Sequence, residues 1–200
     1  MNREHGWRAL FNMNNHIILA SASPRRRELL SVITDNFEVI PSGVEETVPN
    51  NIGLLETAEY LARIKAEDIA KKHKDAVVIG ADTCVIAEGE ILGKPKDKAD
   101  ALRMIKLLSG KTHSVITGCA VIYKGITNSF SSETKVEFFS LSDAEIEEYV
   151  NSSEPYDKAG GYAIQGKASL FVKQIVGDYF NVVGLPVALL NKKLKEEQDL

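Results

Sequence analysis

The chain has 200 residues and a formal net charge of -4, and 44% of its residues are hydrophobic. A chain of this length and composition is expected to fold as one globular unit with a buried core. The negative charge argues against a protein that neutralises a nucleic-acid backbone, because that affinity comes from many Lys and Arg contacts. No apolar run approaches the ~20 residues that span a bilayer, and the N-terminal residues lack the apolar stretch of a secretion signal. We therefore expect a cytoplasmic protein with no nucleic-acid or membrane partner.

The N-terminal part of the chain predicts strands and helices in alternation. A β-branched run at 16–20 leads through a small polar loop to a helix, with Pro24 at the first helical position and Ser23 as its N-cap. A second strand is expected at 37–43, in FEVIPSG. The segment 54–73 has apolar residues in helical register and is the best-defined helix of the sequence.

The middle of the chain predicts longer strands. The stretch 76–92 is almost wholly apolar apart from Asp82, and EGE at 88–90 indicates a tight turn within it. A helix that ends at a glycine is expected over 98–110. Two long strands joined by a Gly-containing turn then occupy THSVITGCAVIYKG and TNSFSSETKVEFFSL.

The C-terminal part predicts shorter elements. Ser142 caps a helix with an acidic first turn. A Gly-rich loop at 160–166 follows, then a strand near 169–177 and a last helix around 186–197. The mixture of βα units with hairpins favours one mixed-sheet α/β unit with helices packed around it.

No internal repeat, low-complexity tract or Pro-rich linker divides the sequence. Residues 1–12 show no clear periodicity, and we interpret them as an N-terminal extension. A single domain is therefore expected over 13–200.

The segment ASASPRRRELL predicts an anion pocket. Ser21 and Ser23 precede a helix whose first turn carries Arg25, Arg26 and Arg27. Free backbone N–H groups at a helix N-terminus favour phosphate, and guanidinium groups bind it through paired hydrogen bonds. The alternative is a solvated basic face on an ordinary amphipathic helix.

Asp82 stands inside an apolar strand, where a carboxylate is excluded unless a metal ion or hydrogen bonds stabilise its charge. At the C-terminal end of such a strand, a carboxylate can hold a divalent ion or take a proton from an attacking water. Phosphoryl transfer needs both. The alternative is an aspartate that caps a turn or accepts hydrogen bonds from loop amides.

Four further charged residues fit the same chemistry. Glu45 and Glu46 follow the second strand and offer the hard oxygen ligands that Mg2+ or Mn2+ requires. Lys65 lies within the long helix and Lys94 follows the hairpin, so each is a candidate for contact with a triphosphate, although an isolated lysine is usually just solvated. Cations for the phosphates and carboxylates for the ion are together what a metal triphosphate requires.

Other motifs are weaker. GYAIQGK at 161–167 matches the first part of a P-loop but is followed by Ala168 where Ser or Thr is required, and SGKT at 109–112 follows a helix instead of opening one. No nucleophile elbow, zinc-protease pair or dinucleotide fingerprint is present. Cys84 and Cys119 have no partner at ligand spacing, which favours two reduced, buried thiols.

With these residues assembled, the sequence resembles the Maf family, the septum-formation-associated nucleotide pyrophosphatases. The likeness runs from residue 16 to about 190, in the family's order and spacing, through LASASPRRRELL, GVEE, IKAEDIA, GADTCVI, ILGKPKD, LSGKTHSVITG, EPYDKAGGYAIQG and FNVVGLPV. It implies two α/β lobes flanking a deep cleft, akin to the inosine triphosphate pyrophosphatases, and a homodimer.

The resemblance also implies the reaction and the roles of single residues. The family's activity-linked positions match Ser21, Arg26, Glu46, Lys65, Asp82 and Lys94. The implied reaction is hydrolysis of a nucleoside triphosphate to monophosphate and pyrophosphate, with water attacking the α phosphate and Mg2+ or Mn2+ bound by Glu46 and Asp82. Whether Asp82 takes the proton of the water or holds the metal ion that acidifies it stays open, since both lower the same barrier.

Within the family, Arg25, Thr83 and Gln165 resemble the branch that acts on dTTP and UTP, with modified pyrimidine nucleotides as further candidates. The amide of Gln165 offers a donor and an acceptor side by side, which match the imide edge of uracil or thymine. Two alternatives remain. One is the branch acting on 7-methyl-GTP, which lacks this set, and the other is a cell-division regulator that senses nucleotides without turnover.

Overall fold

The computed structural model describes residues 15–195. The expected extension at 1–12 lies outside the described residues, as does the start of the expected domain at 13. Between residues 15 and 195, no helix is both long and apolar enough to cross a bilayer.

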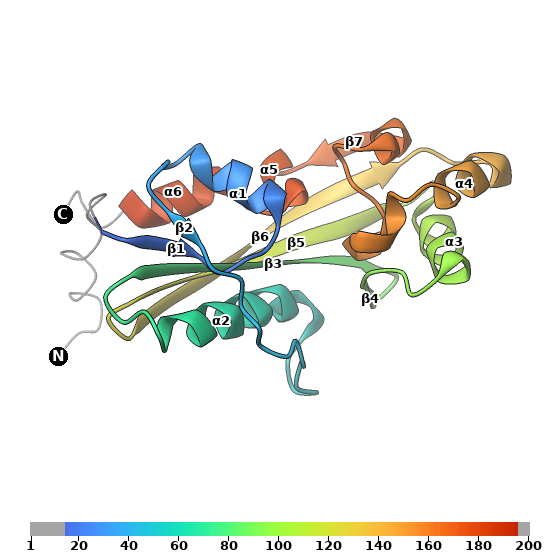
Figure 1. Ribbon diagram of the computed structural model, residues 1–200. Helices are drawn as coiled ribbons and strands as arrows, with labels where there is room; N and C mark the ends of the chain where they lie inside the picture. The colour runs from blue at the N-terminus through green and yellow to red at the C-terminus, as the bar shows by residue number, and fades with distance from the viewer. Residues whose placement is uncertain (1–14, 196–200) are drawn as a thin grey trace.

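In the described part of the chain, seven strands form one mixed, twisted sheet (Figure 1). Its order is β2-β1-β3-β5-β6-β7, and β4 pairs with β3 off this path. β1 is parallel to β2 and β3, whereas the other pairs are antiparallel. The strands are β1 (Ile17–Leu19), β2 (Glu38–Val39), β3 (Val77–Ala87), β4 (Glu90–Leu92), β5 (Thr112–Tyr123), β6 (Ile126–Phe138) and β7 (Val172–Val176).

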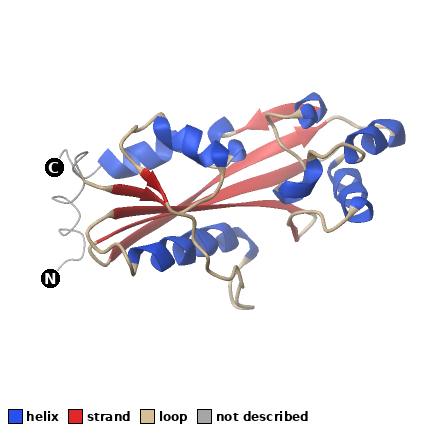
Figure 2. Cartoon of the chain, viewed as in Figure 1, coloured by secondary structure: helices blue, strands red, loops and turns tan. Residues whose placement is uncertain are grey.

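Helices cover both faces of this sheet (Figure 2). α2 lies along one face, α1, α5 and α6 lie along the other, and α3 and α4 gather at the end near β4 (Figure 1). The α-helices are α1 (Pro24–Ser31), α2 (Thr57–Ala70), α3 (Lys98–Leu108), α4 (Asp143–Val150), α5 (Tyr179–Val183) and α6 (Val187–Lys195). Short 3-10 helices are η2 (Leu54–Glu56), η3 (Pro155–Asp157), η4 (Ala159–Gly161) and η5 (Lys167–Phe171). The predicted caps are confirmed, since Ser23 caps α1 and Ser142 caps α4.

Two large apolar cores mark two lobes. One core lies between the sheet and α1, α5 and α6, with Leu30 and Leu190 fully buried in it. The other lies at the far end of the sheet among α3, α4 and η5, with Ile105 and Phe138 at its centre. The expected architecture, a mixed sheet with helices around it in two lobes, is confirmed.

One edge of β3 is open at its centre. β1 pairs with β3 only as far as Ile79, and β4 pairs with it only from Val85 onward. β5 pairs with β3 over this whole stretch, so β1 and β4 share the opposite edge of β3. No strand of the described residues therefore pairs with residues 80–84 on that edge, and Asp82 and Thr83 lie in this gap.

On one face of the sheet, α2 packs against the backbone of β3 and β5 at very short range. A Cβ atom built on Gly118 would lie 2.3 Å from the carbonyl oxygen of Ala58, and one built on Gly80 would lie 2.2 Å from that of Ala62. Both alanines are fully buried. The absence of side chains at the two glycines brings α2 close enough for Lys65 to reach the residues in the gap of β3.

The structure corrects the expected position of Asp82. It does not lie at the C-terminal end of a strand but in the middle of β3, opposite Gly118 of β5. The strand continues past Asp82 because β5 pairs with its other edge without interruption. The carboxylate lines the cavity described below because the chain leaves the sheet at the end of β1, and not because β3 ends.

Two further elements differ from expectation near the C-terminus. The strand expected near 169–177 begins only at Val172, because η5 occupies the residues before it. The helix α5 was not predicted, since five residues are too few for a recognisable period. It is defined instead by its ends, with Asp178 as N-cap and Gly184 at φ 127° as C-cap.

We predict that Gly118→Ala lowers the free energy of unfolding by about 3 kcal/mol, because the new methyl group meets helix backbone, which cannot rotate away. Urea denaturation with a fixed m-value measures the change. Gly43→Ala is the matched control, since a Cβ there meets nothing within 4 Å, and its effect is expected within roughly 0.5 kcal/mol. Equal stability of the two variants would refute the close packing of α2.

Candidate active site

A cavity of about 430 Å³ opens where the edge of β3 is free. It lies between the two lobes, with the loop after β1 and the start of α1 on one side and residues 157–165 on the other. Its lining comprises Ala20, Ser21, Ala22, Ser23, Pro24, Arg25, Arg26, Pro41, Ser42, Glu46, Lys65, Asp82, Thr83, Val85, Lys94, Val115, Asp157, Lys158, Ala159, Tyr162, Ala163, Ile164, Gln165, Val182, Val183 and Gly184. This is the cleft that the resemblance led us to expect.

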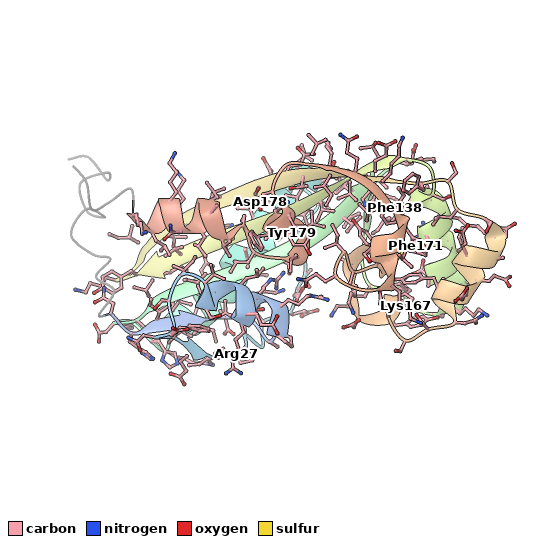
Figure 3. All side chains as sticks on the ribbon, turned by 90° about the horizontal axis from the view of Figure 1, so that it is seen from above. Arg27, Phe138, Lys167, Phe171, Asp178 and Tyr179 are labelled. Carbon is pink, nitrogen blue, oxygen red and sulfur yellow. The ribbon has the colours of Figure 1, made fainter. Side chains whose placement is uncertain are left out.

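The structure brings the sequence-predicted site residues together around this cavity. All nine line it, namely Ser21, Arg25, Arg26, Glu46, Lys65, Asp82, Thr83, Lys94 and Gln165. Two neighbours considered with them do not line it. Arg27 is exposed on α1 and points outward (Figure 3), and Glu45 is exposed beside Glu46. The basic wall therefore contains two of the three consecutive arginines.

Lys65 binds two carboxylates at once. Its Nζ lies 2.6 Å from Oδ1 of Asp82 and 2.9 Å from Oε1 of Glu46. Asp82 is only 9% exposed, so its charge needs this compensation. The second oxygen, Oδ2, has the thiol of Cys84 at 3.9 Å as its contact among the described residues, which leaves this oxygen able to accept a stronger hydrogen bond.

The loop that positions Glu46 is itself tied to α2. The carboxylate of Asp68 accepts hydrogen bonds from the hydroxyl of Ser42 at 2.8 Å and from the N–H of Gly43 at 3.2 Å. The Ser42 hydroxyl is the main cause that holds the pKa of Asp68 below its usual value. Both Lys65 and the anchor of the Glu46 segment thus come from one helix.

Arg26 is fixed by three protein acceptors. Its guanidinium donates from Nε to the carbonyl of Gly184 at 2.9 Å, from Nη1 to Oγ of Ser21 at 3.3 Å and from Nη2 to Oγ1 of Thr83 at 3.0 Å. An arginine has five N–H donors, so two remain for a ligand. The backbone N–H groups of Ser23 and Arg26 already make long hydrogen bonds of 3.3 and 3.4 Å to serine hydroxyls, so these two expected anion donors are partly engaged within the protein.

Behind Thr83 lies a buried polar network that the sequence did not reveal. Oγ1 of Thr83 lies 2.9 Å from Oγ1 of Thr117, whose backbone N–H donates to Oδ1 of Asn181 at 3.0 Å. Nδ2 of Asn181, which is fully buried, donates to the carbonyl of Val115 and to the hydroxyl of Thr134, both at 2.9 Å. The network connects α5 to the floor of the cavity and keeps the acceptors of Arg26 in place.

The opposite wall also contains charged residues that the sequence did not single out. Asp157 and Lys158 line the cavity and form an ion pair with each other. Lys158 is the main cause that lowers the pKa of Asp157, and Arg25 across the cavity adds to the effect. Both residues lie in the motif EPYDKAGGYAIQG, which the sequence shares with the Maf family, but an adjacent Asp and Lys is common on surfaces and did not mark them as lining residues.

Tyr162 forms part of this wall and is held from behind by a histidine. Its hydroxyl lies 2.7 Å from Nε2 of His113 on β5. His113 is 3% exposed and packs edge-on against Phe138, 5.1 Å between ring centroids. Burial lowers the pKa of His113 to about 4, and its Nδ1 has no hydrogen-bond partner among the described residues. The ring is therefore neutral near pH 7.

The two motif alternatives fail on their surroundings. Residues 161–167 lie between two 3-10 helices and not between a strand and an α-helix, and residues 109–112 form the turn from α3 into β5. Cys84 and Cys119 are free and buried on neighbouring strands, as predicted. Burial raises the pKa of both thiols to about 12, so neither is a thiolate near neutral pH.

Comparison with known proteins defines first the fold and then the family. The structure of the Staphylococcus aureus Ham1 protein superposes with a TM-score of 0.55 over 92% of this chain and 100% of that chain, at 17% sequence identity. The likeness is one of fold. The Maf-like protein family model matches residues 16–197. The chain belongs to this family.

Curated relatives match nearly the whole chain. The dTTP/UTP pyrophosphatase of Bacillus anthracis (strain CDC 684 / NRRL 3495) is 51% identical over 180 residues, which cover 90% of this chain and 94% of the relative. The protein of the same name in Bacillus mycoides (strain KBAB4) is also 51% identical, and that in Bacillus cereus (strain ATCC 14579) is 50% identical, with the same coverage.

The buried histidine predicts a pH dependence of stability. Between pH 6.5 and about 4 the unfolded chain binds a proton at His113 that the folded chain does not. Stability is therefore lost as the pH falls through this window, by up to about 3 kcal/mol from this residue. Urea denaturation at pH 7 and pH 4.5 should show a smaller loss for His113→Gln than for the unchanged protein. His73→Gln, at a partly exposed histidine beyond α2, should behave as the unchanged protein, and identical losses in all three would contradict the prediction.

Proposed function

We propose that the chain is a nucleoside triphosphate pyrophosphatase that hydrolyses dTTP and UTP to the monophosphate and pyrophosphate. The observation that carries the proposal is that Asp82, Glu46 and Lys65 meet at one point of a cavity with further basic side chains. The name dTTP/UTP pyrophosphatase, borne by relatives 51% identical over 94% of their own length, supports it.

The basic side chains provide for the charge of the triphosphate. Arg25 and Lys94 line the cavity and form no hydrogen bond or salt bridge with another described residue. Arg26 adds the two N–H donors that do not bond to any residue within 15–195. Lys65 has three donors, of which Asp82 and Glu46 take two, and the third is available to a phosphate oxygen.

The carboxylates fit a divalent ion of the magnesium type. Asp82 and Glu46 are the residues that would hold the ion, through the carboxylate oxygens that Lys65 does not engage, since Lys65 contacts Oδ1 of Asp82 and Oε1 of Glu46. Within 15–195, no group of three or more His, Cys, Asp or Glu side chains is placed to hold a metal ion. Mg2+ needs only one or two carboxylates, since it completes its shell with water and substrate phosphates. When bound, such an ion polarises the phosphoryl group and makes a nearby water more acidic.

Residues of the chain can accept the proton of the attacking water and bind the leaving pyrophosphate. Among the described residues, Oδ2 of Asp82 has only the weak contact with the thiol of Cys84, so this oxygen can take a proton from water, while Oδ1 is held by Lys65. Water adds at the α phosphorus, the bond to the bridging oxygen breaks, and pyrophosphate leaves with its charge bound by Arg25 and Lys94. Whether Asp82 takes the proton or serves as metal ligand, removal of its charge raises the same barrier.

The opposite wall is assigned to the base. Gln165 is exposed to the cavity, and its side chain makes no hydrogen bond to another described residue. Its amide matches the imide edge of uracil or thymine. Thr83 acts indirectly, since its hydroxyl is engaged by Arg26 and Thr117. The homodimer implied by the resemblance stays a prediction.

The proposal predicts the products and the atom that water attacks. UTP or dTTP with Mg2+ in 18O-labelled water should give monophosphate and pyrophosphate in equal amounts, with the label in the monophosphate, and chelation of the metal should abolish turnover. Phosphorus NMR reads both, because 18O shifts the resonance of the phosphorus it joins.

Three other results would each reject part of this assignment. Orthophosphate with a diphosphate, or label in pyrophosphate, would place the attack elsewhere. Faster turnover of 7-methyl-GTP than of UTP would favour the other branch. Tight binding of UTP with Mg2+ but without products would favour a nucleotide sensor.

A further inference from the structure

The wall that carries Gln165 is tied at both ends to one residue outside the cavity, Glu154. This residue follows α4, lies partly buried and does not line the cavity. Its backbone carbonyl accepts a hydrogen bond from Nζ of Lys158 at 3.3 Å, where the wall begins. Its carboxylate binds the chain where the wall ends, at the start of η5. Figure 3 shows η5, from Lys167 to Phe171, in the lobe opposite Arg27.

The carboxylate of Glu154 accepts two backbone hydrogen bonds at that end. Oε2 lies 2.7 Å from the N–H of Lys167 and Oε1 lies 3.2 Å from that of Ala168. Hydrogen bonds to an ionised acceptor are shorter and about twice as strong as neutral ones. The two bonded residues follow Gln165 by two and three positions, so the carboxylate restricts the backbone from which the Gln165 side chain projects.

A tyrosine and a glycine complete this anchor. The hydroxyl of Tyr149 lies 3.2 Å from Oε1 of Glu154 and 3.1 Å from the carbonyl of Gly161, so it joins the carboxylate to the middle of the wall. Burial, with Glu154 as a further cause, raises the pKa of Tyr149 and keeps this hydroxyl protonated. A Cβ at Gly166 would lie 2.2 Å from Oε1 of Glu154, which shows how closely the carboxylate approaches the chain next to Gln165.

The side chain of Gln165 depends on its backbone for its position. Its side chain has no hydrogen-bond partner within 15–195, so its position follows from its backbone. The amide of Gln165 can bind the donor and the acceptor of a base at once only when its own N–H and carbonyl oxygen are both in position. Each lost hydrogen bond lowers the affinity by a factor of about ten or less.

We propose that Glu154 is a positioning residue for base selectivity, which acts through Gln165 and touches no substrate atom. The inference rests on the proposed function, since it requires that Gln165 contact the uracil or thymine imide. The inference assigns a part in base selectivity to a carboxylate that does not line the cavity.

The test compares UTP with N3-methyl-UTP, which has the same phosphates and lacks the imide N–H. Because the two substrates have the same phosphates, the ratio of their kcat/KM values depends on the contact at the imide and not on phosphate binding. We expect Glu154→Ala to lower this ratio by about tenfold, mainly through KM for UTP, with kcat nearly unchanged. Gln165→Ala should lower it at least as much, and the double variant should match Gln165→Ala alone.

Two further variants complete this comparison of single and double variants. Glu148→Ala removes an exposed carboxylate from α4, the helix that precedes Glu154, and should leave the ratio unchanged. If Glu154→Ala does not fold, Glu154→Gln takes its place in the cycle, since its amide retains one acceptor and loses the other, and a smaller drop in the same direction is expected.

The outcomes separate this inference from the function on which it rests. Pyrophosphate release from UTP combined with an unchanged ratio in the Glu154 variants overturns the positioning role and leaves the proposed function standing. An equal drop with and without Gln165 also overturns it, because Glu154 would then act by another route. Absence of pyrophosphate release from UTP by the unchanged protein removes both.

Discussion

The site depends on a buried carboxylate in the middle of the sheet, whose negative charge requires a neighbouring positive charge. Asp82 is in mid-strand and 9% exposed, and its compensation is the ammonium of Lys65 at 2.6 Å. A buried charge without a partner costs several kcal/mol, so this pair constrains everything near it. It requires that α2 approach the sheet closely, which Gly80 and Gly118 permit. It also requires an opening toward solvent, which the gap between β1 and β4 provides.

The same gap explains how two successive residues of one strand serve one cavity. Side chains alternate between the faces of a sheet, so Asp82 turns toward α2 and Lys65 while Thr83 turns toward α1 and Arg26. A complete sheet would separate them. Because β3 has a free edge here, the cavity reaches around it, and the two lobes contribute opposite walls. The polyphosphate and the base can then be bound by different lobes while the carboxylates lie between them.

Much of the fold and of the site could be predicted from the sequence, and the features that could not be predicted have physical reasons in common. The strand–loop–helix at Ser21 to Arg26 and the apolar strand around Asp82 follow from local patterns, and the nine predicted residues all line the cavity. Local patterns do not contain the pairing register, so the mid-strand place of Asp82 and the gap beside it were missed. Asn181 and Glu154 were missed because their partners lie far along the chain or on backbone amides, which leave no trace in residue type.

The most direct test of the account is the turnover of UTP by Asp82→Asn, which keeps the size of the side chain and removes its charge. With Mg2+ at saturation, we expect kcat to fall on the order of 10³-fold, while the circular dichroism spectrum stays that of the unchanged protein. Asp35→Asn, at an exposed position outside the cavity, should retain full turnover. Near-normal turnover by Asp82→Asn would contradict the account, because the carboxylate in the gap of β3 would then have no part in the reaction.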